Sequence, residues 1–383
     1  MAKEKKAEET VDSVKLAAQS FFKANKDEIY TLSSEPYKVS TGVFELDYLL
    51  GGGVSSGSLI RLLGNPSSGK SSEGLLITKN FLETRPKCRA LIIPTEARLT
   101  EKLKGRSGVK FVDHPDEWVN KTALVLPMNL YERIANFIWT LVKTNEMHKP
   151  EDREVFLIFC DCLDYMQIEA DYNKEFGESR RPAGPQYMTK MLWSKLALSF
   201  NAGQHIFLAT SQQSAAPKID PYSKEPSRQG GSSGGSGVQF QASTVIEFSG
   251  RYESDYILED QSLKYDPKKN DKIGHRVSGF LRKTDNEKYD VKFEYAVKYG
   301  RTGGNSVWVE RALYNQLLAW SLLSREGDKG SLNFEPSLLE ELKKIDADVP
   351  EKFRGEKRVY EYLESKPEVT KYLSEKFKTM LMV

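Results

Sequence analysis

The segment GNPSSGKS, residues 64–71, restricts the possible folds of this chain more than any other stretch. It fits the pattern G-x-x-x-x-G-K-[ST], and it follows SLIRLLG (58–64), an apolar run of strand length that ends in glycine. The next residues, SSEGLLITKNFLE (71–83), have the apolar spacing of a helix. A strand, a glycine-rich turn and a helix in this order predict a loop that holds phosphate on its backbone N–H groups.

The residues of this loop have separate expected roles. Lys70 is expected to reach the β- and γ-phosphates of a nucleotide, and the Ser71 hydroxyl is expected to bind Mg²⁺. The alternative is a glycine-rich turn that matches the pattern by chance, and the strand and helix on either side make this the weaker interpretation. The residues predicted to contact the nucleotide are Gly64, Asn65, Pro66, Ser67, Ser68, Gly69, Lys70, Ser71 and Ser72.

Three more apolar runs have the length of buried strands. They are CRALIIPTE (88–96), EVFLIFCDCLD (154–164) and QHIFLATSQQ (204–213). Such near-continuous apolar strands, separated by helical segments, are typical of a parallel sheet that is covered on both faces. With 39% apolar residues, the chain can bury a core of this size. We therefore predict an α/β core with a mostly parallel sheet flanked by helices.

A polar residue stands at or near the end of each of these runs: Glu96, Asp161 and Gln212. Because the carboxyl ends of parallel strands meet at one edge of a sheet, these side chains are expected to lie beside the loop at 64–71. Asp161 is expected to hold Mg²⁺ through a water molecule, Glu96 to position or deprotonate the attacking water, and Gln212 to sense the γ-phosphate. Taken singly, each also fits an ordinary role in a turn or at the start of a helix.

The charge balance leaves the partner open. The formal net charge is only +2 although 29% of the residues are charged, so the total neither requires nor excludes a polyanionic partner. The first residues, MAKEKKAEET, lack the apolar run of a signal peptide, and no stretch approaches ~18 consecutive apolar residues. We therefore expect a soluble cytoplasmic protein with no membrane partner, in which Cys88, Cys160 and Cys162 are buried thiols rather than metal ligands.

The chain resembles the RecA-family recombinases over roughly residues 37–300. The resemblance lies in VSTGVFELDYLLGGGVSSGSLIRLLGNPSSGKSS (39–72), in the TE that ends with Glu96, in FCD with Asp161 and in TSQ with Gln212. The order and spacing of these motifs make the resemblance specific. The short N-terminus with SFFKANKD and the helical C-terminus look closer to the UvsX-type recombinases of bacteriophages.

This resemblance implies an ATP-dependent recombinase with a RecA-like P-loop ATPase core, with ATP and Mg²⁺ as cofactors and with Glu96 and Lys70 as catalytic residues. Its subunits would form a homo-oligomeric helical filament on single-stranded DNA, search homologous duplex DNA and exchange strands in recombination and repair. Single-strand-binding and mediator proteins are further implied partners. The host-cell cytoplasm is the expected location if a bacteriophage encodes the chain.

The sequence departs from the family pattern at two places. The family often has an aromatic ring over the adenine shortly after the catalytic glutamate, and the residues offered here are Leu99, Lys102 and Leu103. Bacterial members also supply two lysines, spaced by one residue, that cap the ATP of the neighbouring subunit. Here Lys283 stands at one position and Asp285 at the other, with Arg282 as the implied substitute. The alternative for Arg282 and Lys283 is a solvated strand end.

Two long segments are implied to bind DNA, at about residues 168–188 and 213–241. Candidate phosphate contacts in and just after the first are Arg180, Arg181 and Lys190, although its acidic residues also fit a solvated surface excursion. The second contains GGSSGGSG, which is too flexible to bury apolar surface and is expected to become ordered on DNA. Phe240 near its end is implied to meet the adjacent subunit. The candidate DNA contacts in the second segment are Lys218, Ile219, Tyr222, Lys224, Arg228, Gly234 and Gly235.

The chain divides into three predicted parts. Residues 1–36 form a polar tail and a short N-terminal oligomerisation helix with Phe21 and Phe22 on its apolar stripe, which would pack on a neighbour or on its own core. Residues 37–302 form the core, and residues 303–383 form a small, mostly helical domain. Two other functions stay open: a ring-forming helicase or motor with a similar core, and a RecA-like regulator that does not recombine DNA. The long central segments and the C-terminal helical domain favour the recombinase.

Overall fold

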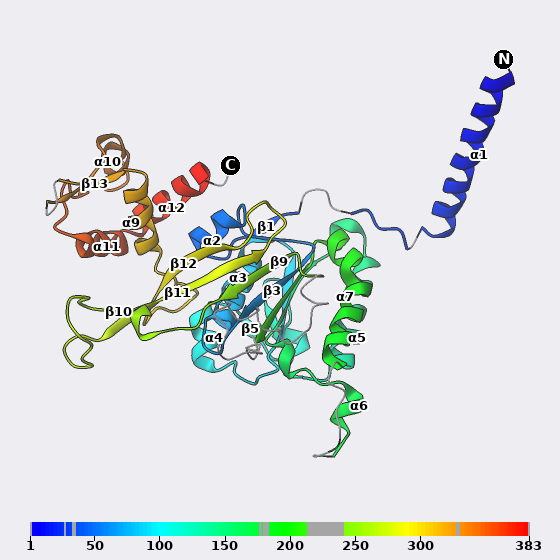
Figure 1. The fold of residues 1–383 in the computed structure, drawn as a ribbon, viewed down its shortest axis with the longest axis horizontal. Helices are drawn as coiled ribbons and strands as arrows, with labels where there is room; N and C mark the ends of the chain where they lie inside the picture. Colours follow the sequence, from blue (N-terminus) through cyan, green and yellow to red (C-terminus); the bar gives the residue numbers. More distant parts are fainter. Residues whose placement is uncertain are drawn as a thin grey trace, which may run out of the picture.

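The computed structural model describes residues 2–26, 28–32, 36–175, 178, 184–212, 241–326 and 330–381. At their centre these residues form a 10-stranded sheet in the order β10-β11-β9-β3-β8-β7-β4-β6-β5, with β12 paired to β11 (Figure 1). Its strands are β3 (Ser58–Gly64), β4 (Cys88–Ile93), β5 (Phe111–Val112), β6 (Ala123–Val125), β7 (Val155–Cys160), β8 (Ile206–Gln212), β9 (Thr244–Phe248), β10 (Tyr256–Leu258), β11 (Lys272–Lys283) and β12 (Val291–Lys298).

The strands from β9 to β5 in this order run parallel to one another. Every residue of β3 is buried, as expected for a central strand that is covered on both faces. The sheet continues beyond β9 with β11, which is antiparallel to β9, β10 and β12. The predicted α/β architecture with a mostly parallel sheet flanked by helices is therefore confirmed, and the antiparallel extension is an addition that the sequence did not predict.

Helices cover both faces of the sheet. Helices α2 and α3 pack on one face, in a core that includes Ile60 and Phe159. Helices α5 and α7 pack on the other, in a core that includes Leu59 and Ile158. The helices are α1 (Ala2–Ala24), α2 (Phe44–Leu49), α3 (Lys70–Thr84), α4 (Glu101–Ser107), α5 (Tyr131–Glu146), α6 (Glu169–Tyr172), α7 (Gly184–Gly203), α9 (Val309–Ala319), α10 (Pro336–Lys343), α11 (Glu356–Ser365) and α12 (Pro367–Leu381), with the short 3₁₀ turns η1 (Pro115–Glu117), η2 (Pro150–Asp152), η3 (Leu163–Tyr165) and η4 (Glu253–Asp255).

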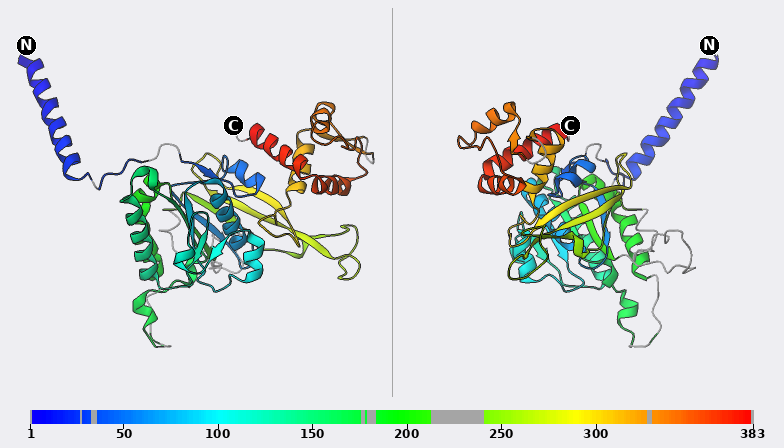
Figure 2. Two further views of the ribbon diagram at one scale, coloured as in Figure 1. Left: turned by 180° about the vertical axis from the view of Figure 1, so that it is seen from behind. Right: turned by 60° about the vertical axis from the view of Figure 1, so that its left-hand side comes forward.

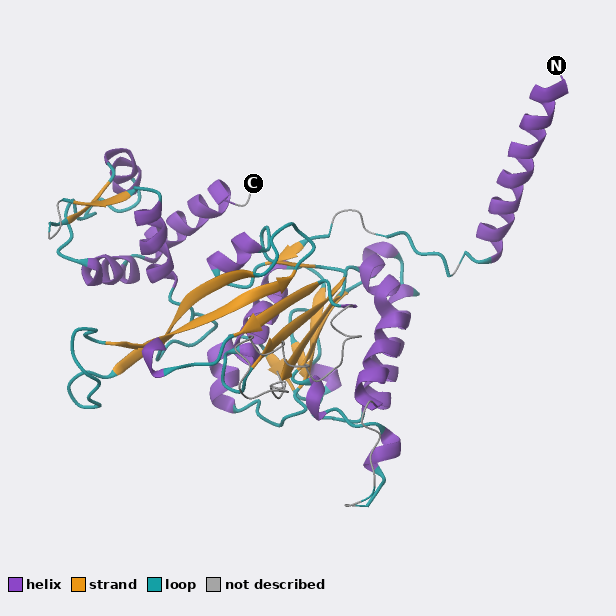
Figure 3. Ribbon diagram, viewed as in Figure 1, coloured by secondary structure: helices purple, strands orange, loops and turns teal. Residues whose placement is uncertain are grey.

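The C-terminal part is mostly helical, as Figure 3 shows. Helices α9 to α12 enclose a third core together with a two-stranded sheet of β13 (Leu323–Arg325) and β14 (Leu332–Phe334). Near the C-terminus, α11 and α12 are two separate helices, since Pro367 has no N–H to continue α11 and instead begins α12. The ring of Phe377 in α12 meets the edge of Phe44 in α2, with ring centroids 6.2 Å apart.

The N-terminal helix α1 is longer than predicted. It has 23 residues and takes in the stretch that was predicted as a polar tail, because Ala, Lys and Glu are strong helix formers. Figures 1 and 2 show α1 extending away from the rest of the chain. Phe21 and Phe22 are 62% and 59% exposed, so they do not pack on the core of their own chain. None of the described helices is long and apolar enough to cross a membrane.

Two short strands flank α2, before the first strand of the central sheet. β1 (Lys38–Val39) pairs antiparallel with β2 (Val54–Ser55) and leads into α2.

Candidate functional site

The loop between β3 and α3, residues 65–69, turns sharply and requires glycine at its start. Gly64 has a φ of 147°. A Cβ at this position would lie 2.5 Å from the carbonyl oxygen of Phe248, so no other residue fits without a shift of the backbone. The ammonium group of Lys70 donates hydrogen bonds of 2.8 Å to the carbonyl oxygens of Gly64 and Asn65. The β3–α3 loop therefore wraps around the first side chain of α3.

The strand ends beside this loop belong to neighbouring strands. β3, β8, β7 and β4 are consecutive in the sheet and parallel, and Gly64 pairs in register with Gln212. Cys160 pairs with both Ala209 and Ile93, so β7 and β4 end at the same edge. The structure therefore brings the predicted residues Glu96, Asp161 and Gln212 to the edge that carries the β3–α3 loop.

Glu96 is the meeting point of this cluster. Its Oε1 accepts a hydrogen bond of 3.2 Å from Nε2 of Gln212 and one of 2.8 Å from the thiol of Cys162. Its Oε2 lies 3.3 Å from a guanidinium nitrogen of Arg98. Only 14% of the Glu96 side chain is exposed. The carboxylate is thus fixed in place and linked to the end of β8.

Asp161 lies between Glu96 and the start of α3. Its Oδ1 accepts a hydrogen bond of 2.5 Å from the Thr210 hydroxyl, and its carboxylate is also hydrogen-bonded to Ser71. Burial raises the pKa of Asp161, and these two hydrogen bonds oppose the rise. Burial lowers the pKa of Lys70, while the negative charges of Asp161 and Glu96 oppose the fall.

The donor set fits a metal that arrives with a nucleotide. In the ranges that the structure describes, no group of three or more His, Cys, Asp or Glu side chains could hold a metal ion. Mg²⁺ commonly takes one or two protein oxygens and completes its shell with phosphate and water. The adjacent hydroxyl of Ser71 and carboxylate of Asp161 suit that mode of binding.

Sequence reasoning missed Asp164 and Arg61. The backbone N–H of Gln212 donates a hydrogen bond of 2.6 Å to Oδ2 of Asp164. Arg61 is fully buried in the middle of β3, and its Nε donates to the Ser211 hydroxyl at 3.1 Å. Burial lowers the pKa of Arg61 to about 10, and the charge of Asp164 opposes this. A charged residue inside an otherwise apolar strand was the signal that could have revealed Arg61.

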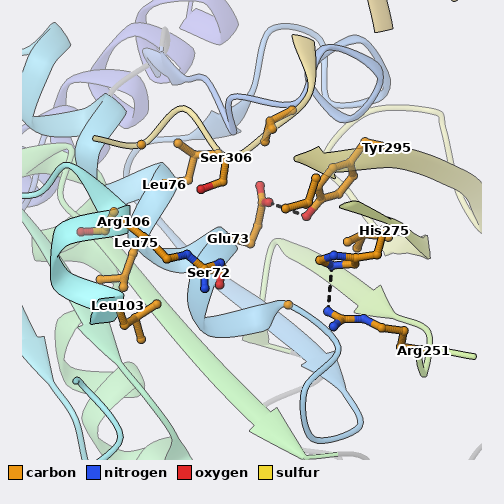
Figure 4. Close-up of a pocket in the computed structure, with 16 residues that line it drawn as sticks. Ser72, Glu73, Leu75, Leu76, Leu103, Arg106, Arg251, His275, Tyr295 and Ser306 are labelled. Atoms are coloured by element: carbon orange, nitrogen blue, oxygen red, sulfur yellow. Dashed lines mark hydrogen bonds between the residues drawn. The ribbon is translucent and has the colours of Figure 1, made fainter. Parts of the chain in front are cut away.

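A small pocket of about 90 Å³ opens beside the N-terminus of α3 (Figure 4). Within it the Tyr295 hydroxyl donates a hydrogen bond of 3.0 Å to Oε2 of Glu73, and Nη2 of Arg251 lies 2.7 Å from Nε2 of His275. The other residues that line the pocket are Gly69, Ser72, Leu75, Leu76, Leu103, Arg106, Ser107, Val277, Val297, Gly304, Ser306 and Val307. Of the three residues expected near a base, Leu103 lines this pocket, whereas Lys102 is exposed and Leu99 packs against the core.

The predicted cap residues lie away from the β3–α3 loop of their own chain. Gly279 in β11 pairs with Phe248, which in turn pairs with Gly64 beside the loop. Arg282 and Lys283 lie further along β11, toward the N-terminal ends of the parallel strands. Arg282 forms ion pairs with Glu247, at 2.7 Å, and with Asp290. The residue at the second cap position, Asp285, accepts a hydrogen bond of 2.6 Å from the Ser55 hydroxyl.

Of the residues predicted to contact DNA, Lys190 lies in the part of the chain that the structure describes. Lys190 is exposed on α7. The others lie outside the described residues, as does the predicted interface residue Phe240: Arg180, Arg181, Lys218, Ile219, Tyr222, Lys224, Arg228, Gly234 and Gly235.

The three cysteines are buried thiols as predicted, and Cys162 additionally contacts Glu96. A scan against protein-family models finds no match for this chain, and a search of curated proteins finds none.

Proposed function

We propose that this protein is an ATP-dependent DNA recombinase of the RecA type, which forms a helical filament on single-stranded DNA and exchanges strands with homologous duplex DNA. One observation carries the proposal: Glu96, Asp161 and Gln212 lie at the ends of neighbouring strands, beside Lys70 and Ser71. Hydrogen bonds link Gln212 to Glu96 and Ser71 to Asp161, and opposite charge couples Lys70 to both carboxylates.

The site fits the phosphates of ATP. The backbone N–H groups of the β3–α3 loop and the N-terminus of α3 would hold them, with Lys70 as the positive charge. The Ser71 hydroxyl and, through water, the Asp161 carboxylate would hold Mg²⁺, which neutralises charge on the phosphates. Glu96 would orient the attacking water and accept its proton, because it is the fixed carboxylate beside the loop.

Gln212 would connect the nucleotide to DNA. It is the last residue of β8, and the segment expected to bind DNA, 213–241, follows it directly. A change of position at its side chain, which contacts Glu96, is passed to that segment through one peptide bond. Single-stranded DNA and homologous duplex DNA would be the substrates of strand exchange, with single-strand-binding and mediator proteins as further partners.

Two different parts of the chain, exposed Phe21 and Phe22 and the partly buried Arg282 and Lys283, support a head-to-tail assembly. Phe21 and Phe22 on α1 are available to a neighbouring subunit, and Arg282 and Lys283 lie toward the edge of the sheet opposite to the β3–α3 loop. Contacts between two different surfaces of one chain give an open filament when the rotation between subunits does not close. The same contacts, with a different rotation, would give the ring of a helicase or motor.

Electron microscopy with ATP, Mg²⁺ and single-stranded DNA, combined with ATP hydrolysis assays, tests the proposal. We expect filaments and DNA-stimulated hydrolysis in the unmodified chain, and loss of the hydrolysis in Lys70→Ala, since Lys70 is the positive charge in the loop. Closed rings without filaments would favour the motor. Nucleotide binding with neither filaments nor stimulated hydrolysis would favour the regulator.

A further inference from the structure

The thiol of Cys162 lies against the carboxylate that is proposed to activate water. Cys162 is only 1% exposed, and its Sγ lies 2.8 Å from Oε1 of Glu96. A carboxylate has only acceptor oxygens, so the thiol is the donor in this hydrogen bond. The other two cysteines have different surroundings: Cys160 packs in the apolar core with Leu59, and the Cys88 thiol faces backbone carbonyl oxygens. Of the three thiols, that of Cys162 is the one that contacts a residue of the site.

Backbone hydrogen bonds fix both ends of this contact. The backbone N–H of Cys162 donates to the Thr95 hydroxyl at 2.8 Å, and that hydroxyl donates to the carbonyl oxygen of Cys162 at 2.6 Å. Thr95 directly precedes Glu96, whose own N–H donates to the carbonyl oxygen of Asp161 at 3.4 Å. The segment after β4 and the segment after β7 are therefore tied together beside the thiol. A side chain on such a fixed backbone can define the position of the group that it contacts.

The two oxygens of the Glu96 carboxylate have different surroundings. Oε1 accepts hydrogen bonds from both Cys162 and Gln212. Oε2 lies 3.3 Å from a guanidinium nitrogen of Arg98, whose side chain is 66% exposed, and an exposed ion pair of this kind contributes little energy. Oε1 is thus held by two donors, and Oε2 is the oxygen that is left to take up a proton.

We propose that Cys162 is a positioning residue for ATP hydrolysis: its thiol holds Oε1 of Glu96 in place, so that Oε2 is the oxygen that accepts a proton from the attacking water. The inference rests on the proposed function and adds a residue to it. In this step the water oxygen forms a bond to the γ-phosphorus, and the bond between that phosphorus and the β–γ bridging oxygen breaks, which leaves ADP and phosphate. The water proton passes to Oε2, and the thiol keeps its own proton throughout.

Cys162 and Gln212 would share this task unequally. Gln212 is also proposed to sense the γ-phosphate, and it directly precedes the segment expected to bind DNA, so its amide would serve both Glu96 and the nucleotide. The thiol has a single proton to donate, and that proton is directed at Glu96. Cys162 would therefore be the more constant of the two donors on the carboxylate.

Single-turnover hydrolysis of ATP by the full chain, with Mg²⁺ and saturating single-stranded DNA, tests the inference. Calorimetric titration with an ATP analogue that has an imido group as its β–γ bridge measures affinity in parallel. In Cys162→Ala we expect the rate to fall about 10-fold, the loss of one hydrogen bond to a charged group, while the affinity changes less than about twofold. Cys162→Ser should bring the rate to within about threefold of the unmodified chain, since its hydroxyl can donate to the same oxygen. Cys88→Ala, which removes a buried thiol outside the site, is the matched control and should leave the rate unchanged.

A double-variant cycle separates positioning from a general loss of structure. Glu96→Gln cannot take up a proton, so the position of its side-chain oxygen no longer sets the rate. Cys162→Ala should therefore change the rate by less than about twofold when Glu96→Gln is already present. Infrared spectroscopy gives a second measurement: a hydrogen bond to a carboxylate lowers the S–H stretching frequency, so one S–H band should move to higher frequency in Glu96→Leu. Because that variant retains Cys162, the measurement remains decisive if Cys162→Ala does not fold.

An undiminished rate in a folded Cys162→Ala variant, or a Cys162→Ser variant as slow as Cys162→Ala, would overturn the inference and leave the proposed function standing. A loss of rate that persists in full beside Glu96→Gln, a loss of affinity as large as the loss of rate, or S–H bands that do not move in Glu96→Leu would also overturn it. Absence of DNA-stimulated hydrolysis in the unmodified chain would instead remove the proposed function itself.

Discussion

The side-chain amide of Gln212 donates a hydrogen bond to Glu96 at 3.2 Å, from β8 across the end of β7 to the segment after β4. This bond joins the last residue before the second predicted DNA-binding segment to the carboxylate predicted to activate water. The backbone of Gln212 is held separately by Asp164, at 2.6 Å. Two different carboxylates, Glu96 and Asp164, therefore hold the side chain and the backbone of the last residue of β8.

Replacing the amide should uncouple DNA from hydrolysis. In Gln212→Ala, the ratio of ATP hydrolysis rates with and without single-stranded DNA should fall on the order of 10-fold, a typical coupling between two sites. Steady-state hydrolysis assays at saturating DNA measure it. Gln261→Ala, at an exposed position of the β10–β11 connection, is the control. An unchanged ratio in Gln212→Ala would mean that another residue transmits the signal.

Glu96→Gln should separate assembly from hydrolysis. The substituted amide keeps an oxygen that can accept from Gln212 and Cys162, so these two contacts persist, while the ion pair with the exposed Arg98 is lost. It cannot take up a proton, and hydrolysis should slow by roughly 10²–10⁴-fold. Single-turnover assays and microscopy of the same sample check both parts. If the variant no longer forms filaments with ATP, Glu96 has a structural role rather than a catalytic one.

Asp164→Ala should reduce stability through Arg61. Arg61 is fully buried, and the nearby carboxylate of Asp164 offsets part of the cost of burying its charge. Because Asp164 also accepts the hydrogen bond from the Gln212 backbone, its removal leaves that N–H without its partner as well, and we expect a loss of about 1–3 kcal/mol. Urea unfolding measures the change in the free energy of unfolding.

The double variant Arg61→Leu/Asp164→Leu should recover much of that loss, because no buried charge is left unbalanced. Asp348→Ala, at an exposed position, is the control and should change the free energy of unfolding by less than about 0.5 kcal/mol. A destabilisation of the double variant as large as that of Asp164→Ala would show that the charge of Arg61 is not the cause.

Glu73 should make stability depend on pH. Its pKa rises from an ordinary 4.5 to about 8 in the folded chain, so between these values the folded state binds a proton that the unfolded state does not. The Glu73 contribution to stability is therefore complete below about pH 4.5 and is lost as the pH rises toward 8, at up to roughly 1.4 kcal/mol per pH unit. The difference in unfolding free energy between the unmodified chain and Glu73→Gln, followed from pH 5 to 9, measures this. Parallel curves for the two proteins would contradict it.

The sequence predicts the central part of the molecule well because the signals there are local. The strand before Gly64, the helix that begins at Lys70 and the strands that end near Glu96, Asp161 and Gln212 are each continuous in sequence. Their meeting at one edge follows from the geometry of parallel strands alone. The glycine-rich turn and the apolar runs were enough to place these residues together.

The antiparallel part of the sheet was not predicted, because a glycine interrupts the apolar alternation of β11. On the buried face of β11 the alternating residues are Val277, Gly279 and Leu281. Gly279 is needed because a Cβ there would lie 2.1 Å from the carbonyl oxygen of Glu247. A glycine at that place in the sequence breaks the apolar alternation that would otherwise indicate a strand.

The pocket beside α3 could not be predicted for a different reason. Glu73 and its partner Tyr295 are separated by 222 positions in the chain, and His275 and Arg251 are joined only by the pairing of distant segments. An acidic residue in the first turn of a helix is ordinarily read as favourable to the helix dipole and solvated. Its burial and its hydrogen bond with Tyr295 of β12 arise from tertiary packing, which the residues around Glu73 in the sequence do not indicate.

Strand β11 has a mechanical consequence for the proposed assembly. Gly279 reaches the end of the sheet beside the β3–α3 loop, and Arg282 lies three residues, roughly 10 Å, further along the same strand. In the proposed filament, this strand would run from the nucleotide site of its own subunit toward that of the next. A change at one nucleotide site could then reach the next site along β11, and hydrolysis along a filament would be cooperative rather than random.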